Sequence, residues 1–390
     1  MLRAARNGDV PELTRLLENN ANIEEMGVHG LSPLHWAARN GHEGVVRLLL
    51  ENNADIAAMD NEHGYSPLHW AAMNDHEGVV RLLLENNADI AARDNEGGRS
   101  PLHWAADKGH EGAVRLLLDN KADIAASSND GNSPLHMAAK HGHEGAVRLL
   151  LEKNADIAAS TNDGASPLHC AAMYGHEGAV ILLLEKNADI AARNKFDRSP
   201  LHMAAMNGHE GAVRLLLEKK ADLAAKNYDG NSPLHVAAKH GHEGVLRLLL
   251  ERNADIAARN NEDGASPLHC AAVYGHEGVL RLLLEENADI AARDDVRVCA
   301  CKWRQMVMAQ WQRCWCAGRA AGGGRMEAAA GRQWQPLHDC SKHRAAFIRS
   351  WQGRELRVAA EEEARRVGEQ LARERELLLS AREKQARERE

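Results

Sequence analysis

Hydrophobic and polar positions along the chain repeat a short pattern that predicts two consecutive helices. After Ser32-Pro33, the apolar positions are Leu34, Trp36, Ala37 and Ala38, two of them only methyl groups. Serine is a favourable N-cap, and proline loses no hydrogen bond at the first helical position. Gly41 can adopt the left-handed conformation that ends a helix. The pattern predicts a first helix of about two turns that a neighbouring helix can approach closely.

A second helix is predicted from about His42 to Asn52. Its apolar residues, 45, 46 and 48–50, form a surface too wide for one contact, so this helix must pack against its partner and against neighbouring units. Glu43 stands in the first turn, where a negative charge is favourable, and is expected to pair with Arg47 four residues later. Asn52 or Asn53 can end the helix in the left-handed conformation, before a turn rich in Asn, Asp and Gly.

The same stretch recurs along most of the chain. The tetrad Ser-Pro-Leu-His begins at positions 33 or 34 residues apart, namely Ser32, Ser66, Ser100, Ser133, Ser166, Ser199, Ser232 and Ser266. A period this regular is the signature of a solenoid, in which each unit buries its apolar face against the next.

The motifs Ser-Pro-Leu-His-x-Ala-Ala, Gly-His, Leu-Leu-Leu-Glu and Ala-Asp-Ile together resemble the ankyrin repeat. The resemblance extends from about Leu2 to Asp295. The chain departs from the family in having Ser before the Pro, where Thr is usual, and Asn53 where Gly is usual; these changes affect turns more than identity. The resemblance implies an all-α solenoid of stacked helix-turn-helix units with β-turn fingers. It also implies protein binding along the concave face.

The resemblance divides the chain into an array and a tail. Residues 1–31 match the later part of a repeat but lack the tetrad, and polar Glu12, Thr14 and Arg15 stand among their apolar positions. We interpret this segment as a partial N-terminal capping repeat, with a truncated gene prediction as the alternative. Residues 32–295 hold eight repeats. From Ser100 onward a second period of three repeats appears, since Lys140-His141 recurs as Lys239-His240 and Met173-Tyr174 recurs as Val273-Tyr274. We interpret it as a copied block of three repeats, either a duplication without a function or a match to a partner that repeats about every 30 Å.

The tail is predicted to be partly helical and partly disordered. Residues 296–317 carry Trp303, Val307, Trp311 and Trp315 at steps of four, which predicts an amphipathic helix. This helix is either a C-terminal cap for the array or a Trp-anchored basic segment for a calmodulin-type groove. A disordered tail and out-of-frame or intron-derived sequence are the other interpretations. Residues 318–353 are a Gly/Arg-rich flexible linker. Residues 354–390 form a charged single helix or a weak coiled coil.

Composition and charge narrow the class of protein. The chain has 390 residues, of which 44% are apolar but only two are Phe and four are Tyr, so Leu, Ala and Val must fill a thin core. No apolar run is long enough to span a membrane, and the start lacks a signal-peptide pattern. We expect an intracellular protein of the cytoplasm or nucleus. The net charge of −8 combines −16 over residues 1–295 with +8 over 296–390.

Histidine and cysteine patterns favour structure over chemistry. Sixteen of the 22 histidines are the two fixed positions of the eight repeats, and we expect each of them to hydrogen-bond locally to turn backbone. Cys170 and Cys270 occupy the position of Trp36 and are expected to be reduced core residues. The tail holds further cysteines and histidines, namely Cys299, Cys301, Cys314, Cys316, His338, Cys340 and His343. Structural zinc sites favour two to four residues between paired cysteines, whereas these pairs have one, so we expect no metal and no cofactor.

No phosphate-binding loop, nucleophile elbow or His-Glu-x-x-His motif is present, and neither the array nor the tail leaves room for a catalytic domain. We therefore expect neither an enzyme nor a small-molecule substrate. Nucleic acid is not an expected partner of the acidic array, although the Arg-rich tail keeps RNA binding as an alternative.

The repeats differ from one another chiefly at the ends of their first helices and at the tips of the turns. These variable positions, and especially exposed Met and aromatic side chains, are the candidate partner-binding residues. They are Arg39, Asn40, Tyr65, Met73, Asn74, Arg99, Asp107, Lys108, Lys140, His141, Met173, Tyr174, Phe196, Arg198, Met206, Asn207, Tyr228, Lys239, His240, Val273 and Tyr274.

The sequence thus predicts a non-enzymatic adaptor or scaffold that binds a protein partner along a concave groove. Because the array is acidic, we expect a groove rimmed with acid that prefers a basic or mixed segment of the partner. The alternatives are a homo-oligomeric scaffold assembled through the C-terminal helix and calmodulin-type binding through the Trp-rich segment.

Overall fold

The structure is a computed structural model that describes residues 1–289 and 292–294. These residues belong to two compact units, unit 1 (Met1–Tyr228) and unit 2 (from Asp229 on). The Trp-rich, linker and charged-helix segments predicted over 296–317, 318–353 and 354–390, with the cysteines and histidines considered for zinc, lie outside the described residues.

Unit 1 consists of helix pairs, each with a first helix that begins at proline and a second that begins at glutamate, except in the pair at the N-terminus. Its helices are α1 (Leu2–Asn7), α2 (Val10–Glu18), the 3-10 helix η1 (Val28–Gly30), α3 (Pro33–Arg39), α4 (Glu43–Glu51), α5 (Pro67–Met73), α6 (Glu77–Glu85), α7 (Pro101–Lys108), α8 (Glu111–Asp119), α9 (Pro134–His141), α10 (Glu144–Glu152), α11 (Pro167–Tyr174), α12 (Glu177–Glu185), α13 (Pro200–Asn207) and α14 (Glu210–Glu218). Unit 2 repeats the arrangement with α15 (Pro233–His240), α16 (Glu243–Glu251), α17 (Pro267–Tyr274) and α18 (Glu277–Glu285).

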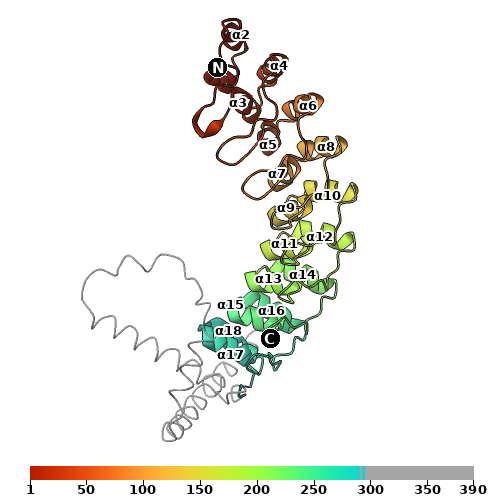
Figure 1. Cartoon of the computed structure of the whole chain (residues 1–390). Helices are drawn as coiled ribbons and strands as arrows, with labels where there is room; N and C mark the ends of the chain where they lie inside the picture. Colours follow the sequence, from red (N-terminus) through yellow and green to blue (C-terminus); the bar gives the residue numbers. More distant parts are fainter. Residues whose placement is uncertain (290–291, 295–390) are drawn as a thin grey trace, which may run out of the picture. The chain divides into compact units, whose positions relative to one another are not determined.

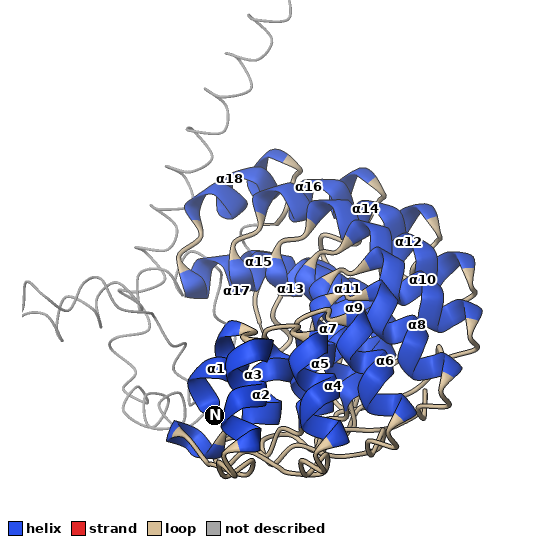
Figure 2. Cartoon of the chain, turned by 90° about the horizontal axis from the view of Figure 1, so that it is seen from above, coloured by secondary structure: helices blue, strands red, loops and turns tan. Residues whose placement is uncertain are grey.

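Within unit 1, the first helices (α1 and the odd-numbered α3 to α13) lie side by side in one row and the second helices lie in a parallel row (Figure 1). The row bends so that the first helices occupy its inner side (Figure 1). The loops between repeats, here called fingers, project from one edge of the helices (Figure 2). The predicted all-α solenoid is confirmed for the described residues.

The predicted core is confirmed in detail. Leu34, Ala37 and Ala38 are at most 1% exposed, and so are Val45, Val46 and Leu49 on the facing second helix. Burying one leucine of this kind contributes roughly 2 to 3 kcal/mol. The flanking leucines of the second helix, 48 and 50, are only half-buried, so the apolar surface is narrower than the sequence suggested. The alanines allow first helices of neighbouring repeats to approach one another.

Each first helix from α3 onward begins with a capping box in which histidine replaces the usual glutamate. In α3 the backbone N–H of Ser32 donates to Nδ1 of His35 (3.2 Å), and the hydroxyl of Ser32 also lies 2.8 Å from Nδ1. Since Nδ1 accepts, the proton of the neutral ring sits on Nε2, which donates to the carbonyl of Tyr65 in the next repeat (3.0 Å).

The same clamp recurs at 2.9 to 3.1 Å from later histidines to the next finger, pairing His69 with Arg99, His103 with Asn132, His136 with Ala165, His169 with Arg198 and His235 with Ala265.

The second histidine of each repeat connects backward. Nε2 of His76 lies 2.9 Å from the carbonyl of Arg39, at the end of the preceding first helix. Its ring also lies against Gly41, where an added Cβ would come within 2.5 Å of Nδ1. That glycine therefore has two reasons to lack a side chain, the ring and its φ of +75°. The prediction that the repeated histidines bond to backbone is confirmed, but the expected local partner is wrong: the first histidine reaches the next finger, and the second reaches the end of the preceding first helix.

Neighbouring fingers are joined by one backbone hydrogen bond per repeat. The bonds run from Asn61 N–H to the His29 carbonyl (2.9 Å), from Asn95 to His63 (2.8 Å), and on to Tyr228 N–H, which donates to Phe196 (3.1 Å). The backbone of the fingers is thus fixed independently of the side chains at their tips.

One predicted ion pair is wrong. Glu43 and Arg47 do not pair in the structure; the carboxylate of Glu43 lies instead against Gly78 at the start of the next second helix, α6. A negative charge is favourable near a helix N-terminus, and a glycine there leaves room for it. The same contact joins Glu77 to Gly112 and Glu111 to Gly145.

Candidate functional site

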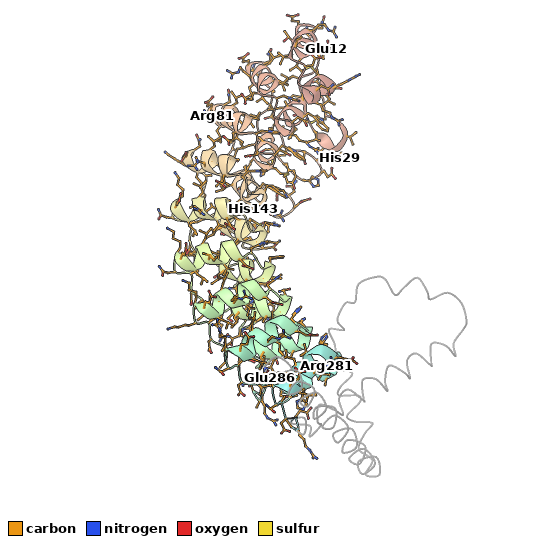
Figure 3. The ribbon with its side chains drawn as sticks, turned by 180° about the vertical axis from the view of Figure 1, so that it is seen from behind. Glu12, His29, Arg81, His143, Arg281 and Glu286 are labelled. Carbon is orange, nitrogen blue, oxygen red and sulfur yellow. The ribbon has the colours of Figure 1, made fainter. Side chains whose placement is uncertain are left out.

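The candidate residues occupy the ends of the first helices and the fingers, on the side of the unit away from the second helices. In Figure 3, Arg81 of α6 marks the outer edge of unit 1 and His29 the opposite edge, where the fingers project. Eleven candidates are exposed: Arg39, Asn40, Asn74, Lys108, His141, Tyr174, Phe196, Asn207, Tyr228, His240 and Tyr274. Eight are partly exposed: Met73, Arg99, Lys140, Met173, Arg198, Met206, Lys239 and Val273.

Tyr65 is buried, and the expectation that it is an exposed contact is wrong. Its side chain is 5% exposed, and its ring packs edge-on against Trp70 (5.3 Å) and Trp104 (5.4 Å). The hydroxyl donates to Glu96 (3.3 Å), and burial raises the pKa of the phenol well above its usual value of 10.0. Tyr65 is therefore part of a small aromatic core under the fingers. The tryptophans of the two adjacent repeats were the sequence signal for it.

Asp107 is also buried, at 8% exposed, contrary to its selection as a surface residue. Its two carboxylate oxygens lie 3.1 Å from Nζ of Lys108 and 3.0 Å from Nε2 of His141, and its carbonyl lies 2.8 Å from Nε2 of His143. These contacts hold α7, α9 and α10 together. Asp107 positions its neighbours and offers little to a partner.

Three candidate asparagines have a local role. The side-chain amides of Asn40, Asn74 and Asn207 donate to the carbonyls four residues earlier, at 2.9, 2.7 and 2.9 Å. Each therefore satisfies a carbonyl that its own helix end would leave unpaired. Their variation between repeats is explained by capping as well as by binding.

Cations cover the tryptophan rings of the first three full repeats. The guanidinium of Arg39 lies 4.6 Å from the Trp70 ring and 5.4 Å from that of Trp36, and Arg6 also covers Trp36 at 4.9 Å. Arg99 lies 4.7 Å from the ring of Trp104. Sequence reasoning selected Arg39 and Arg99 but missed Arg6 and the tryptophans. At these distances the cation and ring attract each other, and the ring is screened from solvent.

Exposed large apolar side chains concentrate on the same side. Among the described residues they are Met26, Val28, Tyr174, Ile181, Phe196, Tyr228 and Tyr274, and all but Ile181 of α12 stand in fingers or at the ends of first helices. Phe196 and Tyr228 occupy neighbouring fingers joined by a backbone hydrogen bond. Tyr228 is the most exposed of all, at 83%.

Charge is distributed differently from what the net charge predicted. Between α3 and α17 the first helices carry four cations, Arg39, Lys108, Lys140 and Lys239, and a single carboxylate, Asp107. The second helices from α4 to α18 each begin and end with a carboxylate. The first-helix ends therefore lack the acid expected along the groove, whereas the fingers on the same side carry exposed carboxylates such as Glu62, Glu96 and Asp163.

The histidines and cysteines are held as structural groups. Burial lowers the pKa of His35, His69, His136 and His169, and lowers that of His103 to about 4, so these rings are neutral at pH 7. Burial raises the pKa of the Cys170 thiol to about 11 and that of Cys270 to about 12. In the part of the chain that the structure describes, His, Cys, Asp and Glu form no group of three or more arranged to hold a metal ion.

Across residues 1–289 and 292–294, no helix combines the length and the hydropathy needed to cross a bilayer.

Comparison with known proteins matches most of the chain to one family. The family model described as "Ankyrin repeats (3 copies)" matches residues 1–94, 57–128, 92–161, 124–194, 187–260 and 225–294, which overlap to cover 1–294. A search of the curated proteins finds no match.

Proposed function

Because the chain belongs to the ankyrin-repeat family, whose members are generally protein–protein interaction modules and typically not enzymes, we propose that it is a non-enzymatic adaptor. Its partner is a protein, bound along the first-helix ends and fingers that form the concave side. No small molecule or cofactor is part of this proposal.

The observation that carries the proposal is the segregation of exposed apolar side chains. Tyr174, Phe196 and Tyr228 are 43%, 43% and 83% exposed, and they belong to first helices and fingers. On the second helices of the described chain, Ile181 is the one large apolar side chain with comparable exposure, at 40%. Aromatic residues are over-represented in binding hot spots.

The backbone that carries these side chains is held in place before any partner arrives. The fingers at Tyr65, Arg99, Asn132, Ala165, Arg198 and Ala265 are each clamped by a histidine of the preceding first helix, as Ala165 is by His136 at 3.0 Å, and neighbouring fingers are hydrogen-bonded to one another. A fixed backbone loses less conformational entropy on binding, so the same contacts give a higher affinity.

The proposal is tested by capture of partners on the immobilised full-length chain. The triple variant Tyr174→Ala, Tyr228→Ala, Tyr274→Ala removes three exposed rings, and each hot-spot truncation of this kind costs roughly 1 to 2 kcal/mol. We expect the amount of bound partner to fall at least tenfold. Circular dichroism should show the same melting temperature for the variant within a few degrees, since the three rings are exposed.

The matched control is Ile181→Arg on the outer helix α12. Seven of the eight full repeats already carry arginine at this position, so the change restores the prevailing residue of the array. It should leave capture unchanged. If Ile181→Arg abolishes capture while the triple tyrosine variant retains it, the partner binds the second helices and the proposal is wrong.

A further inference from the structure

The three-repeat period places the same group of side chains in each unit. We call these groups the Lys–Tyr clusters; each combines the Lys-His end of one first helix with the tyrosine that ends the next. The first cluster is Lys140, His141 and Tyr174, in unit 1, and the second is Lys239, His240 and Tyr274, in unit 2.

In the first cluster, Nζ of Lys140 lies 5.7 Å from the centre of the Tyr174 ring. The ring also stacks with His176, with centroids 6.5 Å apart and planes 15° from parallel. His176 in turn is fixed by its 3.0 Å contact with the carbonyl of Lys140. Beside it His141 stacks on His143 at 6.1 Å. The result is a partly exposed aromatic platform, the Tyr174 ring, with an ammonium group over it and a histidine ring stacked with it.

The second cluster reproduces this geometry closely. Nζ of Lys239 lies 5.5 Å from the Tyr274 ring, and Tyr274 and His276 stack at 6.4 Å with planes 9° apart. His276 Nε2 lies 2.9 Å from the carbonyl of Lys239. The stacked pair of His240 and His242, at 6.2 Å, completes the match. Tyr174 and Tyr274 are 43% and 42% exposed, so both platforms present similar areas.

Both clusters carry a positive charge that the described residues do not neutralise. Neither Lys140 nor Lys239 lies within ion-pair distance of a carboxylate there, whereas Lys108, Lys153 and Lys195 pair with Asp107, Asp119 and Asp163. The one carboxylate at the first cluster, Asp107, is taken up by Lys108 and His141. An unpaired ammonium group beside an exposed ring complements an acidic side chain next to an aromatic one.

We propose that each Lys–Tyr cluster binds a short segment of a partner protein in which an acidic residue stands next to an aromatic residue. The carboxylate pairs with the lysine, and the ring packs against the exposed part of the tyrosine side chain. The chain therefore offers two equivalent sites, one per unit, and suits a partner that carries this segment twice. The inference rests on the proposed adaptor function and adds the chemistry of the partner. The proposed segment is acidic, whereas the negative net charge of the array suggests a basic one.

The test uses full-length chain labelled with ¹³C in its tyrosine rings, observed by NMR. The sequence has four tyrosines, and each resonance is assigned by a single substitution. The probe is the synthetic peptide acetyl-Gly-Glu-Phe-Glu-Gly-amide, with acetyl-Gly-Lys-Phe-Lys-Gly-amide as its charge-reversed control. We expect the acidic peptide to shift Tyr174 and Tyr274 with dissociation constants equal within about threefold, in the millimolar range. The resonance of buried Tyr65 should not shift. Tyr228 is the control for nonspecific contact, because its ring is exposed but lies in neither Lys–Tyr cluster.

Two single variants separate the sites. Lys140→Glu should weaken binding at Tyr174 at least tenfold and leave Tyr274 unchanged, and Lys239→Glu should do the reverse. Because each variant keeps one intact site, loss of both responses in either variant would overturn the inference. No shift at Tyr174 or Tyr274 with the acidic peptide up to about 5 mM, or an equal response to the basic peptide, would also overturn it. The adaptor proposal is tested apart from this, since capture that depends on the three tyrosines can persist when the acidic peptide does not bind.

Discussion

Acidification should unfold the array through its buried histidines, and His103 gives the magnitude. The ring is fully buried in α7, where Nδ1 accepts from the N–H of Ser100 at 3.1 Å and Nε2 donates to the Asn132 carbonyl at 2.9 Å. Burial is the main cause that lowers its pKa from 6.5 to about 4, and the nearby Arg93 acts in the same direction. The Asn132 contact opposes the change without outweighing it.

The sign follows from proton linkage. Between pH 6.5 and about 4 the unfolded chain binds a proton at this residue that the folded chain does not, so stability falls as pH falls through that window. The full loss from His103 is about 3 kcal/mol, and at pH 5 it is about 2 kcal/mol. Above pH 6.5 His103 makes its full contribution to the free energy of unfolding, and below pH 4 that contribution is lost and no longer changes with pH. His35, His69, His136 and His169 have pKa values lowered in the same direction and add to the effect.

The assay is urea unfolding followed by circular dichroism at pH 7.5 and pH 5, for the wild type and His103→Gln. Glutamine can still donate to the Asn132 carbonyl but cannot be protonated, so the variant should be less stable at pH 7.5 by roughly 1 to 3 kcal/mol. Its further loss between pH 7.5 and pH 5 should be about 2 kcal/mol smaller than that of the wild type. Amide hydrogen exchange in α7 locates the change within the array. Equal pH dependence in the two proteins would refute the reasoning.

Two further predictions concern packing. Asp75 has φ of +59° where other repeats have glycine, so Asp75→Gly should raise the free energy of unfolding by up to about 1 kcal/mol. Gly41→Ala should lower it by about 1 to 2 kcal/mol or more, because the new Cβ meets the His76 ring. Thermal unfolding measures both changes, and a shift of both variants in the same direction would contradict the argument. In urea unfolding, Tyr65→Ala should lower the free energy of unfolding by roughly 3 to 5 kcal/mol, because the ring is buried, whereas Tyr228→Ala should lower it by less than about 0.5 kcal/mol. Similar losses for the two variants would mean that the aromatic core under the fingers is not formed.

The sequence predicted the parts of the fold that depend on local chemistry. Ser32-Pro33 starts a helix and Gly41 ends one through interactions within a few residues of the chain. The eightfold recurrence of the tetrad predicts that the units stack in a row. The alanines and leucines of the core follow from the same periodicity, because only one register of the two helices buries them all.

What the sequence did not reveal were contacts made between repeats. His35 reaches a carbonyl 30 residues later and His76 one 37 residues earlier, and neither separation corresponds to a helix or strand period. The burial of Tyr65 depends on Trp104 from the following repeat, and that of Asp107 on His141. In both cases variability between repeats predicts a surface position, although a position can also vary because its neighbour in the next repeat varies with it.

This distinction also bears on which variable positions can determine binding. A residue such as Tyr65 or Asp107, whose side chain is already occupied by a neighbouring repeat, can change only together with that neighbour, so its identity reflects packing. Tyr174 and Lys140 differ, because the carbonyl of Lys140 is held by His176, that of Met173 beside Tyr174 is held by His209, and both side chains remain partly exposed. Substitution there alters the surface while leaving the stack intact. The repeated histidines and glycines thus confine the freedom of the chain to a few positions. Because two sets of those positions, one in each unit, carry the same side chains, a segment that binds one cluster should bind the other with the same chemistry.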